Sequence, residues 1–163
     1  MGLKMMMLVA LCVLPALVSA TRPMRNPFVV CGRVYCDTCL AGFETPATTY
    51  IQGAKIRVEC KIRDTLKLVY SVEGVTDHTG SYEVSVADDH GDQICESVLV
   101  SSPQSDCSTI MIGRERAAVF LTTDNGIVAN TRFANNLGFK KNKAISGCTQ
   151  IMQQYKLNNE EDL

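Results

Sequence analysis

The sequence predicts an all-β domain, an antiparallel β-barrel or sandwich of about seven strands that is stabilised by disulfides and carries a short C-terminal helix. Three observations predict this. Short runs of alternating apolar and polar residues recur along the chain with turn residues between them. The chain has 8 cysteines among 163 residues, and its composition is that of an ordered protein, 46% hydrophobic and 20% charged. A net charge of −1 argues against a nucleic-acid-binding protein.

The strands can be placed in order. Residues 28–35 are rich in β-branched and aromatic side chains, which favours a strand. In residues 54–60, Ala, Ile, Val and Cys alternate with Lys, Arg and Glu, which predicts a strand with one wet face. Further strands are expected at residues 66–72, 82–86, 94–100 and 117–122, and the helix at residues 149–155.

A turn is expected within residues 74–82, which read as strand, turn, strand. The Asp77 side chain can accept hydrogen bonds from the turn backbone, and Gly80 can adopt the positive φ that such a turn requires.

Residues 1–20 have the features of a secretory signal peptide. Lys4 precedes an apolar run over residues 5–14, and the segment ends in Val18-Ser19-Ala20, a small-residue cleavage site. The run is too short to cross a membrane, so no membrane insertion is expected. The remaining residues, 21–163, are interpreted as one β domain with a short acidic C-terminal tail, secreted to the extracellular space or cell wall.

The cysteine count leaves one thiol over. Cys12 lies in the signal peptide, so seven cysteines remain, and an oxidising compartment favours disulfides among them. Cys36 and Cys39 form a C-x-x-C motif. A redox motif would need a helix N-terminus to lower the thiol pKa, and a zinc site would need a second close pair. Structural disulfides are the favoured interpretation, although spacing alone does not select their pairing.

Few residues are candidates for a catalytic or metal-binding role. His78 and His90 lie in loops at opposite ends of a predicted strand, roughly 20 Å apart, so they are interpreted as surface histidines and not as a catalytic pair. The acidic loop 88–92 lacks the residue order of a calcium loop. We therefore expect no catalytic residue, no cofactor and no metal site.

A set of basic residues could bind wall polyanions or could simply form a solvated face. It comprises Arg114, Arg116 and the run 140–143.

One motif has a clear counterpart in a known family. It comprises Gly32, Val34, Tyr35, Cys36, Asp37 and Cys39. With this motif, and with further matches as far as Cys148, the chain closely resembles the Ole e I-like family of plant pollen proteins, named after the main olive pollen allergen. Cys31 stands where the family usually has Glu or Gln, and Leu40 where it usually has Arg.

The resemblance implies an extracellular β-barrel-like domain with three disulfides. Carried over by position, the pairs are Cys36–Cys107, Cys39–Cys148 and Cys60–Cys95. Cys31 is then the odd thiol, which either links two copies into a homodimer or is buried and inert.

The family also implies a secreted, non-enzymatic protein that acts by binding, as a ligand or wall-associated factor in plant growth or reproduction, and several members are allergens. Its expected partner is an extracellular protein, such as a receptor ectodomain, or a cell-wall component. The alternative is a small secreted enzyme or enzyme inhibitor acting on wall or RNA substrates, with His90 as the residue to test.

Overall fold

A computed structural model describes residues 28–160, and only the backbone of residues 156–160. The expected signal peptide lies outside the described residues. The elements are β1 (Phe28–Asp37), β2 (Thr49–Tyr50), β3 (Lys55–Ile62), β4 (Leu68–Val75), β5 (Ser81–Val86), β6 (Gln93–Ser101), β7 (Thr109–Ile110), β8 (Arg116–Val119), β9 (Thr131–Phe133), β10 (Leu137–Lys140) and α2 (Cys148–Glu160).

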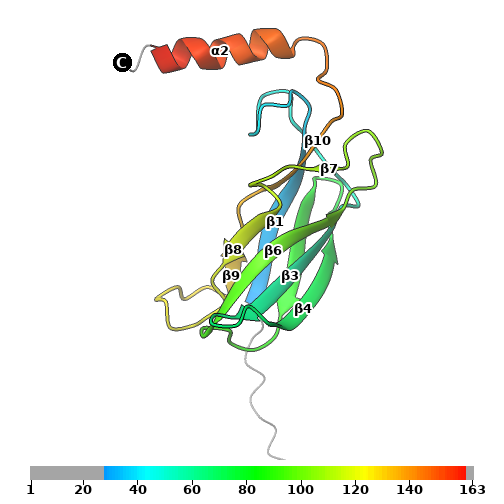
Figure 1. The fold of residues 1–163 in the computed structure, drawn as a ribbon. Coiled ribbons are helices and arrows are strands. Elements are labelled where there is room, and N and C mark those ends of the chain that lie inside the picture. Colours follow the sequence, from blue (N-terminus) through cyan, green and yellow to red (C-terminus); the bar gives the residue numbers. More distant parts are fainter. Residues whose placement is uncertain (1–27, 161–163) are drawn as a thin grey trace, which may run out of the picture.

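The strands form two sheets that face each other (Figure 1). One sheet is built around the long strand β1, whose first half pairs with β5 and β9 and whose second half pairs with β2 and β10. The other sheet has the order β4-β3-β6-β8. The predicted all-β class is confirmed. The strands that the sequence analysis did not identify (β2, β7, β9 and β10) have two to four residues each.

The first sheet is mixed, which corrects the purely antiparallel expectation. β1 pairs in parallel with β9, Val30 opposite Arg132, and with β10, Cys36 opposite Phe139. Both partners follow the long connection from β8 in the opposite sheet. A crossover of this kind brings the chain back in the direction of β1, whereas a hairpin would reverse it.

The core lies between the sheets and follows the alternation in the sequence. In β5, Tyr82, Val84 and Val86 are buried, while the intervening side chains face outward. Ile56 and Val58 of β3 face them from the other sheet and are fully buried. Burying a side chain of this size contributes about 1.5–3 kcal/mol, so the two alternating strands supply much of the stability.

The predicted turn between β4 and β5 is confirmed. One carboxylate oxygen of Asp77 accepts hydrogen bonds from the backbone N–H groups of Thr79, at 2.8 Å, and Ser81, at 3.0 Å. Gly80 has φ +73°, the left-handed conformation expected for it.

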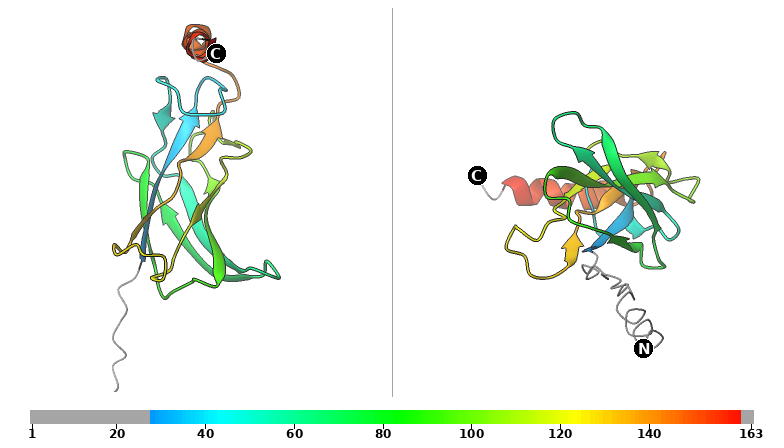
Figure 2. Two further views of the ribbon diagram at one scale, coloured as in Figure 1. Left: turned by 90° about the vertical axis from the view of Figure 1, so that its left-hand side faces the viewer. Right: turned by 90° about the horizontal axis from the view of Figure 1, so that it is seen from below.

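Helix α2 lies beyond the end of the sheets where β1 and β10 finish (Figures 1 and 2). It begins at Cys148, one residue before the predicted start, and the disulfide Cys39–Cys148 ties it to the loop after β1. The rings of Phe43 and Tyr155 meet edge to face, 5.0 Å apart. Within residues 28–160, no helix has the length and apolar character needed to cross a membrane.

Candidate functional site

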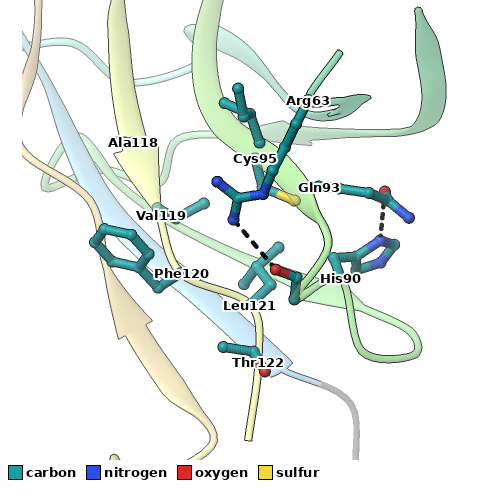
Figure 3. Close-up of a pocket in the computed structure, with 11 residues that line it drawn as sticks. Arg63, His90, Gln93, Cys95, Ala118, Val119, Phe120, Leu121 and Thr122 are labelled. Carbon is teal, nitrogen blue, oxygen red and sulfur yellow. Dashed lines mark hydrogen bonds between the residues drawn. The ribbon is translucent and has the colours of Figure 1, made fainter. Parts of the chain in front are cut away.

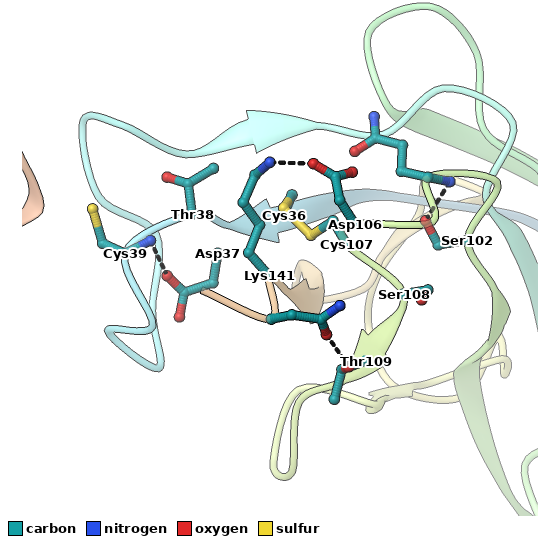
Figure 4. The surroundings of a disulfide bond; sticks show 12 residues. Cys36, Asp37, Thr38, Cys39, Ser102, Asp106, Cys107, Ser108, Thr109 and Lys141 are labelled. Atoms are coloured by element: carbon teal, nitrogen blue, oxygen red, sulfur yellow. Dashed lines mark hydrogen bonds and ion pairs between the residues drawn. A yellow bond between two sulfur atoms is a disulfide. The ribbon is translucent and has the colours of Figure 1, made fainter. Parts of the chain in front are cut away.

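The six motif residues lie on β1 and just after it, and their side chains have structural roles. Val34, Tyr35 and Cys36 are buried in the core. The buried Asp37 carboxylate accepts hydrogen bonds from the N–H groups of Cys39, at 3.1 Å, and Gly42, at 2.8 Å, which holds the turn after β1 (Figure 4). The buried side chains of the motif therefore shape the frame of the protein, and Gly32 is the one of the six that lines the groove described below.

The structure joins the cysteines in the three pairs that the resemblance implies: Cys36–Cys107, Cys39–Cys148 and Cys60–Cys95. The first two pairs fix the end of β1 to the segment before β7 and to α2. The third joins β3 to β6 at directly opposite positions.

The outer face of the first sheet carries a groove of about 600 Å³ over strands β9, β1 and β5. Cys31 lies at its centre, because register places it opposite Glu83 of β5 on one side and opposite Phe133 of β9 on the other. The Phe133 side chain is 81% exposed, although it is aromatic and lies on a strand. We call this feature the Cys31 groove.

One end of the Cys31 groove is polar, and its side chains contact one another. The Arg33 guanidinium stacks 3.4 Å from the ring centre of Tyr50 and donates a hydrogen bond to the Thr79 carbonyl. The Glu44 carboxylate accepts hydrogen bonds from Tyr50 Oη and from Asn136 Nδ2, both at 2.9 Å. Arg33 and Asn136 thus reach the groove from fixed positions, which suits recognition of a polar group.

The Cys31 thiol is half-buried and belongs to none of the disulfides among the described residues. Burial raises its pKa above the ordinary value of 9.0, and the nearby Glu83 carboxylate raises that pKa further. Because the thiolate is the reactive form, Cys31 is a weak nucleophile at neutral pH.

His90 is not the surface histidine that the sequence analysis expected; it is 6% exposed. Its backbone N–H donates to the Leu121 carbonyl, which draws the polar loop against the segment after β8. The centre of the ring lies 4.8 Å from that of Tyr70, and the two rings are tilted by 55°. Nε2 is hydrogen-bonded to the Ala87 carbonyl, at 2.9 Å, and Nδ1 to the Gln93 side chain, at 3.0 Å (Figure 3). With both nitrogens engaged, the ring offers no free acid or base for the enzyme alternative.

His78 agrees with the sequence analysis and is exposed. The acidic loop is folded around Asp89, whose carboxylate accepts hydrogen bonds from the N–H groups of Gly91 and Thr123, both at 2.9 Å. These hydrogen bonds lower the pKa of Asp89, with the largest contribution from Thr123. The loop therefore uses this carboxylate to hold its own backbone.

Two cations of the proposed basic patch are engaged in ion pairs. Arg116 lies 3.0 Å from Glu96 and 3.5 Å from Glu59 on the outer face of the second sheet. Lys141 pairs with Asp106 beside the Cys36–Cys107 disulfide (Figure 4). These two charges are therefore partly neutralised within the protein.

Comparison with known proteins now decides the family. The model of the family described as "Pollen protein Ole e 1 like" matches residues 26–156. The chain belongs to the Ole e 1-like family. Pollen-specific protein C13 of Zea mays is 43% identical, over 95% of this chain and 91% of that protein. Protein DOWNSTREAM OF FLC of Arabidopsis thaliana is 42% identical, over 91% and 90%.

A solved structure supports the fold of this Ole e 1-like protein. The crystal structure of the major plantain pollen allergen Pla l 1 matches with a TM-score of 0.67 and 32% identity, covering 74% of this chain and 98% of that one. Of these three relatives, one is named as a pollen-specific protein and one as a pollen allergen, and none of the three names is that of an enzyme.

Proposed function

We propose that this Ole e 1-like protein is secreted and acts by binding, without catalysis, as a ligand or wall-associated factor in plant growth or reproduction. Three features support the proposal: family membership, the signal-peptide pattern in residues 1–20, and three disulfides suited to an oxidising compartment.

The observation that carries the proposal is the Cys31 groove. Its floor is β1, the strand that pairs with four others and is fixed at its end by two disulfides, so the groove is held rigidly. It combines an exposed aromatic ring, Phe133, with the oriented polar groups of Arg33 and Asn136. Specific binding sites commonly combine apolar contact area with a few oriented polar groups.

The proposed partner is an extracellular protein, such as a receptor ectodomain, or a wall component. The experiment is affinity capture from plant cell-surface extract with oxidised mature protein as bait. Phe133→Ser removes the aromatic ring from the groove. Val128→Ser is the matched control, because Val128 is 97% exposed and lies outside the groove.

A partner retained by the wild type and by Val128→Ser, but lost by Phe133→Ser and by reduced, alkylated protein, supports the proposal. Equal capture by the Phe133→Ser and Val128→Ser baits contradicts the assignment of the groove. Equal capture by the oxidised and the reduced, alkylated baits contradicts the need for the disulfide-held fold.

A homodimer linked through Cys31 remains a second proposal for this surface. The raised pKa of the thiol slows its oxidation, so any dimer should form slowly at neutral pH. Non-reducing electrophoresis of the wild type and of Cys31→Ser tests it, and a wild type that stays monomeric after prolonged air oxidation contradicts it.

A further inference from the structure

The loop between β8 and β9 carries an asparagine followed by a glycine, Asn125-Gly126. Both residues are exposed, as are their neighbours in the loop. A Cβ placed on Gly126 would meet nothing within 4 Å, and no hydrogen bond among the described residues engages the Gly126 N–H. Because glycine also has the widest choice of backbone conformation, the peptide unit after Asn125 is free to move toward the Asn125 side chain.

The Asn125 side chain is already folded back along the chain that follows it. Its Oδ1 accepts a hydrogen bond from the Ile127 N–H, at 3.1 Å, so the side-chain amide lies against the next two peptide units. A donor placed on a carbonyl oxygen stabilises the negative charge that develops there when a nucleophile attacks the carbon. The Ile127 N–H occupies that position for the Asn125 amide. The nucleophile beside it is the backbone nitrogen of Gly126, whose attack closes a succinimide ring.

We propose that Asn125 is a deamidation site activated by the Ile127 N–H, and that it converts to aspartate and isoaspartate without an enzyme. The Gly126 nitrogen loses its proton and bonds to Asn125 Cγ. The Cγ–Nδ2 bond breaks, and Nδ2 leaves as ammonia. Water then opens the succinimide. Its attack at Cγ gives aspartate, and its attack at the main-chain carbonyl carbon gives isoaspartate, in which the backbone runs through Cγ. The net reaction consumes water and releases ammonia, with no oxidation or reduction.

Two other exposed asparagines show what distinguishes Asn125. Asn135 and Asn142 are each followed by a residue with a Cβ, which crowds the backbone nitrogen that would have to attack. The Asn142 side chain also accepts a hydrogen bond from Thr109 Oγ1, at 3.2 Å, which holds it against β7. Exposure alone therefore does not create the site, and these two asparagines serve as internal references.

The conversion changes the loop without reaching the sheets. It adds a negative charge to a chain whose formal net charge is −1, and the isoaspartate form lengthens the backbone. The loop is held on both sides of Asn125: the Asp89 carboxylate accepts from the Thr123 N–H, and the buried Arg132 donates to the Ala129 carbonyl. The Cys31 groove should stay intact, so the modification is independent of the partner binding proposed above. Because the reaction needs only water, the acidic fraction would record the age of the folded protein.

The test follows each asparagine separately with time. The oxidised mature chain is incubated in neutral buffer, sampled at intervals, and digested at mildly acidic pH, which suppresses deamidation during the digestion. A zero-time sample is the reference. Peptide mass spectrometry detects the replacement of NH₂ by OH, and enzymatic methylation detects isoaspartate. We expect Asn125 to convert at least about tenfold faster than Asn135 and Asn142.

Variants separate the effect of the loop from that of the Asn-Gly pair alone. Ile127→Pro removes the N–H that contacts Asn125 Oδ1 and should slow the conversion by at least about tenfold. The matched control Ile127→Val keeps this N–H and should convert at the wild-type rate, with circular dichroism showing that both variants fold. Conversion of Asn125 no faster than that of Asn135 and Asn142 overturns the proposal. Equal rates in Ile127→Pro and Ile127→Val also overturn it, because the activation is assigned to that N–H.

Discussion

The first residue of the signature motif, Gly32, should tolerate no side chain, because the ring of Tyr82 occupies the space. The two residues are paired across β1 and β5. A Cβ atom on Gly32 would lie 2.3 Å from Tyr82 Oη and 2.6 Å from Cζ. Since ordinary contacts begin near 3.4 Å, the ring would have to move by roughly 1 Å in Gly32→Ala.

The expected loss of stability in Gly32→Ala combines two effects. Overpacking a buried site costs about 1–3 kcal/mol. Moving the ring also breaks the buried hydrogen bond from Tyr82 Oη to Ser97 Oγ, which is 2.8 Å long and contributes about 1 kcal/mol. Gly32→Ala should therefore lower the free energy of unfolding by about 2–4 kcal/mol.

Urea denaturation of the disulfide-intact protein, followed by far-ultraviolet circular dichroism because the chain has no Trp, measures this loss. The decisive comparison is a double-mutant cycle with Tyr82→Leu. Leucine lacks all three atoms that the new methyl group would meet, so Gly32→Ala should cost less than about 0.5 kcal/mol in that background. An equal loss in both backgrounds would refute the reasoning.

Three further outcomes are expected. Arg132 is 4% exposed, and its guanidinium donates hydrogen bonds to the carbonyls of Phe120 and Thr122. Arg132→Met should therefore lower the free energy of unfolding by about 2–4 kcal/mol and speed hydrogen exchange in residues 120–130, and unchanged exchange there would contradict this. Burial opposes ionisation of Glu59, but Arg57, Lys61 and Arg116 outweigh it and lower its pKa below 4.5. Its stabilising effect should be complete above that pH and lost as the pH falls through the folded-state pKa, so urea titrations of wild type and Glu59→Gln should converge in acid. Alkylation of native Cys31 should have its midpoint above pH 9.0, and a midpoint at or below that pH would contradict the raised pKa.

The alternation of apolar and polar residues predicted the strands that bury one face. The alternation in β3 and β5 located both strands within one or two residues, since one face of each is buried against the opposite sheet. The turn at Asp77 and Gly80 was equally readable, because its hydrogen bonds and positive φ involve neighbouring residues.

The features that depend on distant contacts were not predicted. β9 has three residues, too few for a period to show, and its parallel pairing depends on the path of the chain from β8. The polar loop around His90 has the composition of an exposed turn, yet the Leu121 carbonyl and the Tyr70 ring draw the histidine inside. The sequence also did not mark Phe133 as a binding residue, because its place in the proposed groove depends on the pairing of β9 with β1, which puts it opposite Cys31.

The disulfide pattern limits what a protease can release from this protein. The loops closed by Cys36–Cys107 and Cys39–Cys148 overlap in the sequence, so a single cut at any peptide bond between Cys36 and Cys148 leaves the two pieces covalently joined. A protease that opens one exposed loop therefore yields a nicked molecule and no free fragment. Its halves stay at a high effective concentration and keep their paired strands, so an antibody or partner that contacts both halves would still find its surface intact.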